Sequence, residues 1–330
     1  MTAVRYMMSS ETWGPEAMGD QSEKTVVVTG ANSGIGFEVT KAFAENGARV
    51  VMACRSLDRG NAASEEIRAA VADPSLSVME LDLADLDSVR SFAETFRTEY
   101  SDLHVLSNNA GVMAIPRSET EDGFETQFGV NHLGHFALTG LLLDRLRETA
   151  GETRIVTQSS GLHERGEIDF ADLHGEQSYD RFDAYAQSKL ANVLFAYELD
   201  RRLRAANAEV TSVACHPGFA ATNLQRRGPE LAGSKLRLWM MKLANAVFAQ
   251  SAATGALPML MAGTDADVAG GEYVGPGGLM NMRGAPVIQR SSDRSYDDEL
   301  ARQLWDVSVD LTGVSYDLPD PQAPDATSAN

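Results

Sequence analysis

Tyr185 and Lys189 are the two residues of this chain whose types and spacing could do acid–base chemistry. The segment from Asp183 onward has the apolar spacing of a helix, and residues four apart on a helix share one face. A free tyrosine has a pKa of about 10 and is a poor base at neutral pH. We expect the positive charge of Lys189 to lower the pKa of Tyr185 and so make it a general acid/base. Alone, a tyrosine and a lysine four residues apart more often lie on a solvated helix face. The prediction of acid–base chemistry therefore depends on the other motifs before and after the pair.

A glycine-rich turn stands between a predicted strand and a predicted helix near the start of the chain. Residues 24–29 are a β-branched run typical of a buried parallel strand, residues 37–46 have a helical pattern, and residues 48–53 form a second strand. Strand, glycine turn, helix and strand in this order indicate a dinucleotide-binding site. Gly30, Gly34 and Gly36 would let the backbone approach a pyrophosphate, and the helix N-terminus would stabilise its negative charge.

Arg55 follows the second predicted strand. A site for NAD usually has an acidic residue there to bind the ribose hydroxyls, whereas an arginine can pair with the 2′-phosphate of NADP. The plainer alternative is a surface arginine at the start of a helix. We therefore expect NADP(H) to be preferred over NAD(H). Asp82, after the third predicted strand, could bind the adenine amine or could cap the helix that follows it.

Strands and helices alternate along the rest of the chain. Further strands are expected at 77–81, 103–107, 154–158, 209–215 and 272–274, and further helices at 57–71, 85–100, 121–148, 225–250, 251–263 and 297–311. This alternation predicts an α/β fold, a single-domain Rossmann-type doubly wound parallel sheet of about seven strands with helices on both faces. We expect residues 1–22 to be a loosely ordered arm, 23–315 the domain, about 219–250 its substrate-loop region, and 316–330 a flexible tail.

Two features of the helical segments bear on ligands. Residues 225–250 are apolar and rich in methionine, as in a core helix or a lid over an apolar substrate. His132 and His135 are spaced like a metal-binding pair, but neither a glutamate nor a third ligand accompanies them. We therefore expect no metal site.

The composition is that of an acidic protein. With 28 basic and 47 acidic residues the net charge is −19, which disfavours binding of nucleic acid or anionic membranes through a basic surface. Only five of the basic residues are lysines, which resembles proteins of salt-loving organisms; a merely acidic protein is the alternative. Two cysteines, no apolar run of 18 residues and no secretory signal predict a cytoplasmic protein without disulfides or a membrane span.

With these motifs in hand, the chain resembles the short-chain dehydrogenase/reductase family from about residue 24 to residue 310. The family's motifs occur in order: TGANSGIG at 29–36, NNAG at 108–111, Asn131, Ser160, Tyr185-x-x-x-Lys189 and Pro217-Gly218. Within the family it is similar to the retinol dehydrogenase, WW-domain oxidoreductase and protochlorophyllide reductase-like subgroup. The strings that carry this likeness are ACR at 53–55, VNHLGHF at 130–136, SKLANVL at 188–194 and HPG at 216–218. There are two departures: no membrane anchor, which some members have, and Gln158 where many have a small or apolar residue.

The resemblance implies a role for each matching residue. Tyr185 would give its proton to the carbonyl oxygen in reduction, and Lys189 would lower the pKa of Tyr185 and bind the nicotinamide ribose. Ser160, rather than Ser159, would hydrogen-bond the substrate oxygen. Asn131 would hold a water in a proton relay behind Lys189. The residues implied in cofactor binding are Gly30, Asn32, Ser33, Gly34, Ile35, Gly36, Arg55, Asp82, Leu83, Asn109, Ala110, Gly111, Tyr185, Lys189, Pro217, Gly218 and Thr222.

The sequence thus predicts an NADP(H)-dependent oxidoreductase that interconverts an alcohol with a ketone or aldehyde, on a hydrophobic small molecule. A homo-oligomer is compatible with the resemblance. One alternative is a catalytically idle dinucleotide-sensing protein, and the complete set of Asn131, Ser160, Tyr185 and Lys189 argues against it. A sugar epimerase or dehydratase of the extended branch is disfavoured by NNAG at 108–111 and by the short tail.

Overall fold

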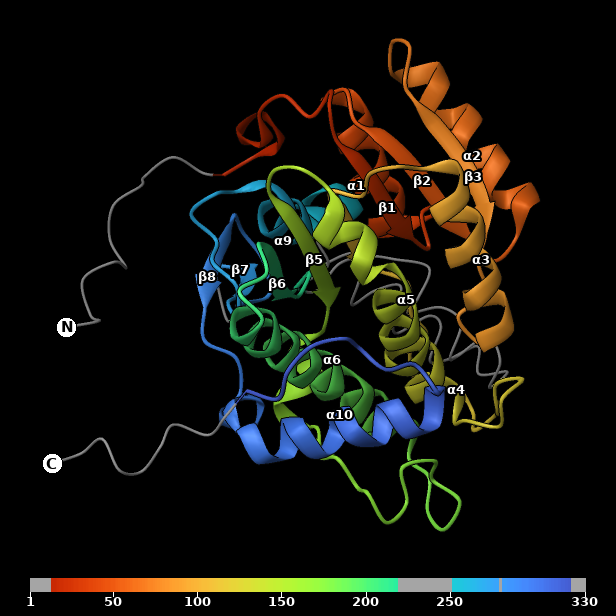
Figure 1. The fold of residues 1–330 in the computed structure, drawn as a ribbon, viewed down its shortest axis with the longest axis vertical. Helices are drawn as coiled ribbons and strands as arrows, with labels where there is room; N and C mark the ends of the chain where they lie inside the picture. Colours follow the sequence, from red (N-terminus) through yellow and green to blue (C-terminus); the bar gives the residue numbers. More distant parts are fainter. Residues whose placement is uncertain (1–12, 219–250, 279–280, 322–330) are drawn as a thin grey trace, which may run out of the picture.

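An eight-stranded sheet runs through the molecule in the order β3-β2-β1-β4-β5-β6-β7-β8 (Figure 1). The computed structural model describes residues 13–218, 251–278 and 281–321. All neighbouring strands are parallel except β7 and β8, which are antiparallel. The strands are β1 (Thr25–Thr29), β2 (Arg49–Cys54), β3 (Leu76–Glu80), β4 (Val105–Asn108), β5 (Thr153–Gln158), β6 (Val210–Cys215), β7 (Tyr273–Pro276) and β8 (Pro286–Gln289).

Helices cover both faces of the sheet because successive side chains of a buried strand point to opposite sides. In β1, Val26 and Val28 pack with α1, α2 and α9, whereas Val27 packs with α3, α5 and α6. α10 lies along α6, outside this second layer (Figure 1). The helices are α1 (Gly34–Glu45), α2 (Leu57–Ala70), α3 (Leu86–Glu99), α4 (Thr126–Phe128), α5 (Gly134–Glu148), α6 (Arg181–Ala205), α9 (Ala252–Thr264) and α10 (Asp298–Thr312).

The strand order reverses between β1 and β4. β1 lies between β2 and β4, so the chain leaves these strands toward opposite sides of the sheet. Loops that diverge in this way leave a crevice at the carboxyl ends of the strands, where ligands bind in doubly wound folds. The glycine-rich turn after β1 and the segment after β4 therefore meet at this crevice.

The predicted parallel sheet with helices on both faces is confirmed, with two corrections. The sequence prediction of about seven strands missed β8, a four-residue strand that begins with a proline and follows a glycine-rich stretch. The predicted helix over 121–148 does not begin at 121. Residues 119 and 125 form an isolated bridge instead, and Glu125 caps α4 by accepting bonds from two backbone N–H groups.

The ends of the described chain pack on the domain more than the sequence indicated. Trp13 contacts the core on the α9 side, and Met18 is buried there. Tyr316, which the sequence placed in the flexible tail, is half-buried and donates a hydrogen bond to the carbonyl of Phe136 at 2.6 Å. Asp320 lies 2.5 Å from Arg202 of α6. Within the described residues, Trp13, Met18 and Tyr316 therefore pack against the domain.

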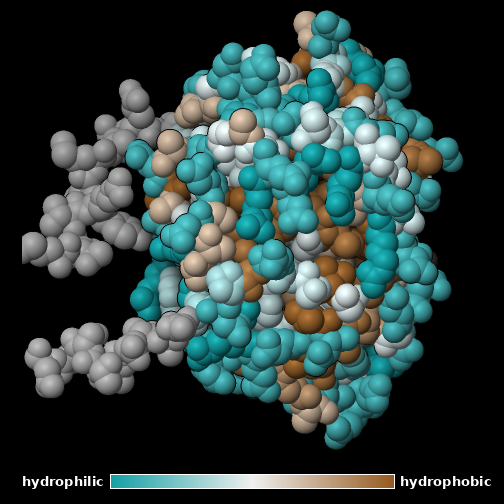
Figure 2. Space-filling model, in the orientation of Figure 1, coloured by the Kyte–Doolittle hydropathy of each residue, from teal (hydrophilic) through white to brown (hydrophobic). Residues whose placement is uncertain are grey.

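The surface is mostly hydrophilic on the face drawn in Figure 2, with apolar side chains gathered near its middle. In the ranges that the structure describes, no helix combines the length and the apolar character needed to cross a membrane.

Candidate active site

The turn after β1 forms a cradle of backbone groups. Gly30 and Gly34 have φ of +67° and +59°, which favours glycine, and α1 begins at Gly34. A Cβ on Gly36 would lie 2.4 Å from the carbonyl oxygen of Gly30, so only glycine permits this approach. The cap residue Ser33 makes no side-chain bond to the helix N-terminus. The first N–H groups of α1 are therefore left for an anionic ligand, and the cradle fits a dinucleotide pyrophosphate.

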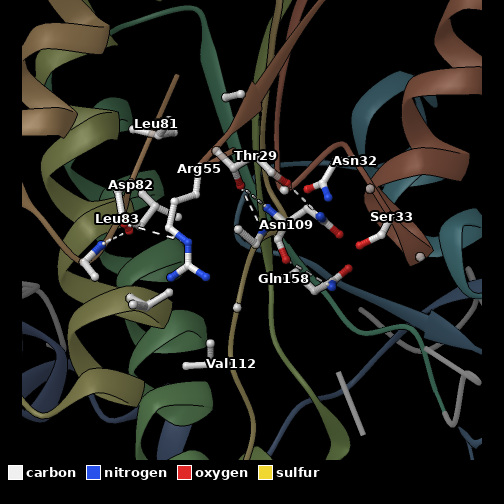
Figure 3. A pocket seen from close by; sticks show the side chains of 18 of the residues that line it. Thr29, Asn32, Ser33, Arg55, Leu81, Asp82, Leu83, Asn109, Val112 and Gln158 are labelled. Carbon is white, nitrogen blue, oxygen red and sulfur yellow. Dashed lines mark hydrogen bonds and ion pairs between the residues drawn. The ribbon is translucent and has the colours of Figure 1, made fainter. Parts of the chain in front are cut away.

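A cleft runs from this cradle along the carboxyl ends of the strands (Figure 3). Of the residues predicted to bind the cofactor, those that line it are Gly30, Asn32, Ser33, Gly34, Ile35, Gly36, Arg55, Asp82, Leu83, Asn109, Ala110 and Gly111. Arg59, Thr126, Val130 and Gln158 also line it. The sequence analysis did not single out Arg59. Its position four residues after Arg55, in the first turn of α2, could have indicated a second arginine at the cofactor phosphate.

Arg55 and Asp82 face each other across one end of the cleft (Figure 3). The Arg55 Nε lies 3.9 Å from the Asp82 carboxylate, and both side chains are partly exposed. The other Asp82 oxygen accepts the N–H of Ala84 at 3.0 Å, while Asp85 caps α3. Asp82 thus braces the turn before α3 and holds Arg55 only loosely. The guanidinium groups of Arg55 and Arg59 are two positive charges at the same cleft.

Thr29 joins the segments that follow β1 and β4. Its hydroxyl oxygen accepts the backbone N–H groups of Asn109 and Ala110, both at 2.9 Å. The Asn109 side chain in turn donates to the carbonyl of Thr29 at 2.7 Å. The Nε2 of His135 lies 2.9 Å from the same hydroxyl. It accepts a hydrogen bond from this hydroxyl, because the other ring nitrogen faces the carbonyl of Asn131 and carries the ring hydrogen. These bonds fix the floor of the cleft.

Asn131 lies in a π-turn, Gly129–Leu133, that joins α4 to α5. Both hydrogens of its amide are taken, by the carbonyl of Val112 and by the Ser188 hydroxyl, each at 2.9 Å. Its side-chain oxygen accepts the Val112 N–H at 2.8 Å. Asn131 therefore ties the loop after β4 to α6, and a water could reach it only through its oxygen atoms.

Tyr185, Ser160 and Lys189 come together beside the cleft. The Ser160 hydroxyl lies beside the phenol of Tyr185. The Lys189 ammonium lies 5.7 Å from the centre of the Tyr185 ring and donates to the Gln158 carbonyl at 3.1 Å. A Cβ on Gly111 would lie 3.6 Å from this nitrogen, so Lys189 reaches the cleft at Gly111.

The protonation of this pair is governed by burial. Burial raises the pKa of Tyr185 to about 12, although the bond from Ser160 opposes the rise. Burial also lowers the pKa of Lys189 to about 8. In the protein without cofactor, the pKa of Tyr185 therefore lies above its ordinary value, because the phenol is removed from water. The lowering of this pKa by Lys189 stays a prediction.

Ser159 and Ser160 point to different partners. The hydroxyl of Ser159 is buried and donates to the carbonyl of Lys189 at 2.7 Å. Ser160 accepts the N–H of Leu162 at 3.3 Å and begins a short 3₁₀ turn, Gly161–Arg165. Ser159 thus holds the backbone of α6, and Ser160 holds the phenol.

The remaining predicted residues lie apart from the described cleft lining. Gly218 has φ of +65°, and a Cβ there would lie 2.5 Å from the carbonyl of Met282. Pro217 precedes it, and Thr222 and the predicted apolar helix over 225–250 lie outside the described residues. His132 bonds the Ser308 hydroxyl, and the structure describes no cluster of three metal-ligating side chains in the part of the chain it covers.

Comparison with known proteins agrees with this architecture. The profile of the short chain dehydrogenase family matches residues 24–230. Human retinol dehydrogenase 11 is 43% identical over 294 residues, covering 89% of this chain and 87% of that protein. Retinol dehydrogenase 14 of Mus musculus is 41% identical over 303 residues, covering 88% and 86%.

Solved structures share the fold. An uncharacterized protein from Mycobacterium Paratuberculosis is 39% identical with a TM-score of 0.77, covering 93% of this chain and 99% of that one. A structure from Beutenbergia cavernae with bound NADP is 25% identical with a TM-score of 0.57, covering 76% and 92%. The profile match, the identities and the cleft at the strand reversal together show that the chain is an oxidoreductase that belongs to the short-chain dehydrogenase/reductase family, in its retinol dehydrogenase-like subgroup.

Proposed function

We propose that this protein is an NADP(H)-dependent oxidoreductase that interconverts an apolar alcohol and its carbonyl compound, with Tyr185 as general acid/base. The observation that carries the proposal is the meeting of Ser160, Tyr185 and Lys189 beside a cleft whose cradle fits a pyrophosphate. A nicotinamide cofactor bound in this cleft supplies or accepts the hydride. The residues of the chain bind it, orient the substrate oxygen and move the proton.

The substrate oxygen would sit between the Ser160 hydroxyl and the Tyr185 phenol. These two groups lie beside each other, so we place both within reach of a single substrate oxygen. In reduction, negative charge develops on that oxygen, Ser160 donates a hydrogen bond to it, and the phenol gives it a proton. A phenol whose pKa is about 12 is protonated at neutral pH, as this step requires.

Lys189 would serve the cofactor and the phenol together. Its ammonium lies beside Gly111, which lines the cleft, and within 5.7 Å of the Tyr185 ring centre. At that place its charge stabilises the phenolate left after proton transfer, and it can donate to a ribose hydroxyl. Loss of Lys189 should therefore affect both turnover and cofactor binding.

Arg55 and Arg59 support the choice of NADP(H). Both line the cleft, and Arg55 holds Asp82 only at 3.9 Å, which leaves its donors available to a phosphate. An apolar substrate is supported by the apolar residues at 225–250 and by relatives named retinol dehydrogenases.

The test is a panel of ketones and aldehydes of rising apolarity, followed by NADPH absorbance with purified protein. Tyr185→Phe keeps the ring and removes the proton carrier, so turnover should fall by about two to four orders of magnitude with cofactor affinity unchanged. Ser160→Ala should also lower turnover. Ser159→Ala is the matched control: it removes a bond to the α6 backbone and should cost about 1 kcal/mol of stability with little loss of turnover.

Two outcomes would contradict the proposal. Wild-type turnover by Tyr185→Phe would remove the assigned mechanism. Tight NADPH binding without turnover of any member of the panel, in either direction, would favour the idle dinucleotide-sensing protein instead.

A further inference from the structure

A buried polar cluster lies between the ends of β5, β6 and β7, next to Ser160. It consists of His163, His216 and Tyr273, which are 1%, 4% and 2% exposed. The His216 ring stacks on Tyr273 at 5.2 Å and 10°, and the His163 ring meets the same tyrosine edge-on at 5.1 Å. None of these three side chains has a part in the chemistry described above, yet each bonds a segment that carries it.

His163 is bonded to the catalytic serine. Its Nδ1 lies 2.7 Å from the carbonyl oxygen of Ser160, and a carbonyl only accepts, so Nδ1 carries the ring proton. Its Nε2 is then the acceptor, and it takes the backbone N–H of Ser292 at 3.1 Å. The Ser160 carbonyl also accepts the backbone N–H of His163 at 3.0 Å. Two bonds on one carbonyl hold the Ser160 peptide, and hence the direction of its side chain toward Tyr185.

His216 has the opposite arrangement. Its Nδ1 accepts the backbone N–H of Gly218 at 3.3 Å, so the proton is on Nε2. The side-chain nitrogen of Gln289 in β8 lies 2.5 Å from Nε2, and the Gln289 side-chain oxygen is buried without a partner. With the His216 proton on Nε2, we assign the flipped amide, which places the Gln289 oxygen there as the acceptor. A Cβ on Gly275 would lie 2.0 Å from Nε2, so the glycine of β7 makes room for this contact.

Tyr273 links the cluster to Lys189. Its hydroxyl lies 3.2 Å from the Nδ1 of His163 and is next to the side chain of Ser159. Ser159 donates to the Lys189 carbonyl. Burial lowers the pKa of His216 to about 3 and also lowers the pKa of His163, so both rings are neutral and each keeps one fixed tautomer.

We propose that His163 and His216 are positioning residues with separate duties: His163 sets Ser160 for catalysis, and His216 sets the Pro217–Gly218 turn for cofactor binding. Both are anchored on the segment from β8 to Ser292, so this edge of the sheet supports both halves of the site. The inference rests on the proposed function of Ser160 and of the Pro217–Gly218 turn.

Substitutions to asparagine and to glutamine distinguish these positioning roles from a general contribution of the histidine rings to packing. An asparagine amide reaches the place of a histidine Nδ1, and a glutamine amide reaches the place of Nε2. His163→Asn therefore keeps the bond to Ser160 and loses the one to Ser292, whereas His163→Gln does the reverse. His163→Asn loses the bond to Ser292, and His163→Gln loses the contacts of Nδ1 with Ser160 and Tyr273. The melting temperature of each variant is therefore measured beside its turnover. His163→Gln should lower kcat by about 10- to 100-fold, because small misplacements of a reacting group are that costly, and His163→Asn should turn over close to wild type. The NADPH Kd should be unchanged in both.

The same two substitutions at His216, to asparagine and to glutamine, should change the NADPH Kd and not kcat. His216→Asn keeps the acceptor for the Gly218 N–H, and His216→Gln loses it. His216→Gln should weaken NADPH binding by about fivefold to tenfold, the effect of one hydrogen bond, while kcat at saturating NADPH stays near wild type. His216→Asn should bind NADPH close to wild type.

A spectroscopic measurement tests the arrangement without turnover. Long-range 1H–15N spectra of the full chain should show His163 as the Nδ1–H tautomer and His216 as the Nε2–H tautomer near pH 7. Equal tautomers, or a protonated ring, would overturn the inference, as would equal kcat losses in the two His163 variants. Tyr185→Phe is measured in parallel: wild-type turnover in that variant would overturn the proposed function, whereas its expected loss together with indistinguishable Asn and Gln variants would overturn only this inference.

Discussion

The side-chain nitrogen of Lys189 lies 3.1 Å from the carbonyl oxygen of Gln158, the last residue of β5. The same nitrogen is next to Gly111, which follows the neighbouring strand β4. Lys189 is therefore a charge held between two strand ends and largely removed from water. This explains why burial lowers the pKa of Lys189 to about 8, inside the range in which enzymes are assayed.

Lys189 should make NADPH binding dependent on pH. Below a pKa of about 8 the ammonium is charged and attracts the anionic cofactor, and above it the charge is lost. The NADPH Kd of the wild type should rise as pH passes from 7 to 9. Lys189→Arg stays charged throughout and should show no step in that interval, even if its binding is weaker. Titration by protein fluorescence measures both, and an identical step in the two proteins would assign it to another group.

Arg55 and Arg59 should set the cofactor preference. Removing one charge-assisted bond to a 2′-phosphate costs about 1.5–3 kcal/mol, so Arg55→Ala and Arg59→Ala should each weaken NADPH binding by about 10- to 100-fold. The affinity for NADH, which lacks that phosphate, should change little. Arg302→Ala on α10 removes a surface arginine outside the cleft and is the matched control. Wild-type affinities that are equal for NADPH and NADH would refute the assignment.

His132 should make the fold sensitive to acid. It is 1% exposed, its Nε2 contacts the Ser308 hydroxyl at 2.8 Å, and burial lowers its pKa to about 3 from an ordinary 6.5. The unfolded chain takes up a proton as pH falls below about 6.5, while the folded protein resists until about pH 3. The free energy of unfolding should therefore decrease as the pH is lowered, and this residue contributes up to about 1.4 kcal/mol per pH unit.

Urea unfolding between pH 7 and pH 4.5 measures this slope. His135 and His216 have pKa values lowered by burial to about 4 and about 3, so they add to the slope in the same direction. His132→Asn should be less stable at pH 7, because a buried ring is lost, but should show a slope smaller by close to one proton. An unchanged slope would mean that His132 is already protonated in the folded protein.

The acidic surface should make stability dependent on salt. The net charge is −19, and the surface in Figure 2 is mostly hydrophilic. At 1 M salt the Debye length is about 3 Å, so repulsion between exposed like charges that lie farther apart than this is largely screened. We expect the melting temperature to rise between dilute buffer and molar KCl by more than that of a near-neutral control protein. A flat profile would remove the proposal of a salt-adapted protein and leave the enzyme proposal intact.

Short sequence motifs predicted those parts of the site in which the residues are close together in the chain. The turn from Gly30 to Gly36 and the pair Tyr185 and Lys189 are each set by residues within one turn of helix or loop, so their spacing was enough. The strand order that brings them together followed from the alternation of strands and helices. The pKa of Tyr185 could not be predicted in this way, because it depends on how much water the whole fold excludes.

The parts that the sequence did not predict depend on distant contacts. The helix expected from residue 121 begins at Thr126, because a bridge between residues 119 and 125 holds the preceding segment as a turn. Tyr316 falls within 316–330, the segment expected to be a flexible tail from its composition, yet it packs on Phe136 of α5. His163 follows a motif but shows its role only through Ser292, a residue far along the chain.

The bond between the His163 ring and Ser292 joins residues 129 positions apart. A ribosome that has added Gln158, the last of the described residues that line the cleft, still has to add the whole segment from β6 to Ser292. In the order of synthesis, every described residue that lines the cleft therefore precedes the backbone donor that supports the His163 ring. Translation that stops before residue 292 leaves a chain with every described cleft residue and without the donor that fixes the ring behind Ser160.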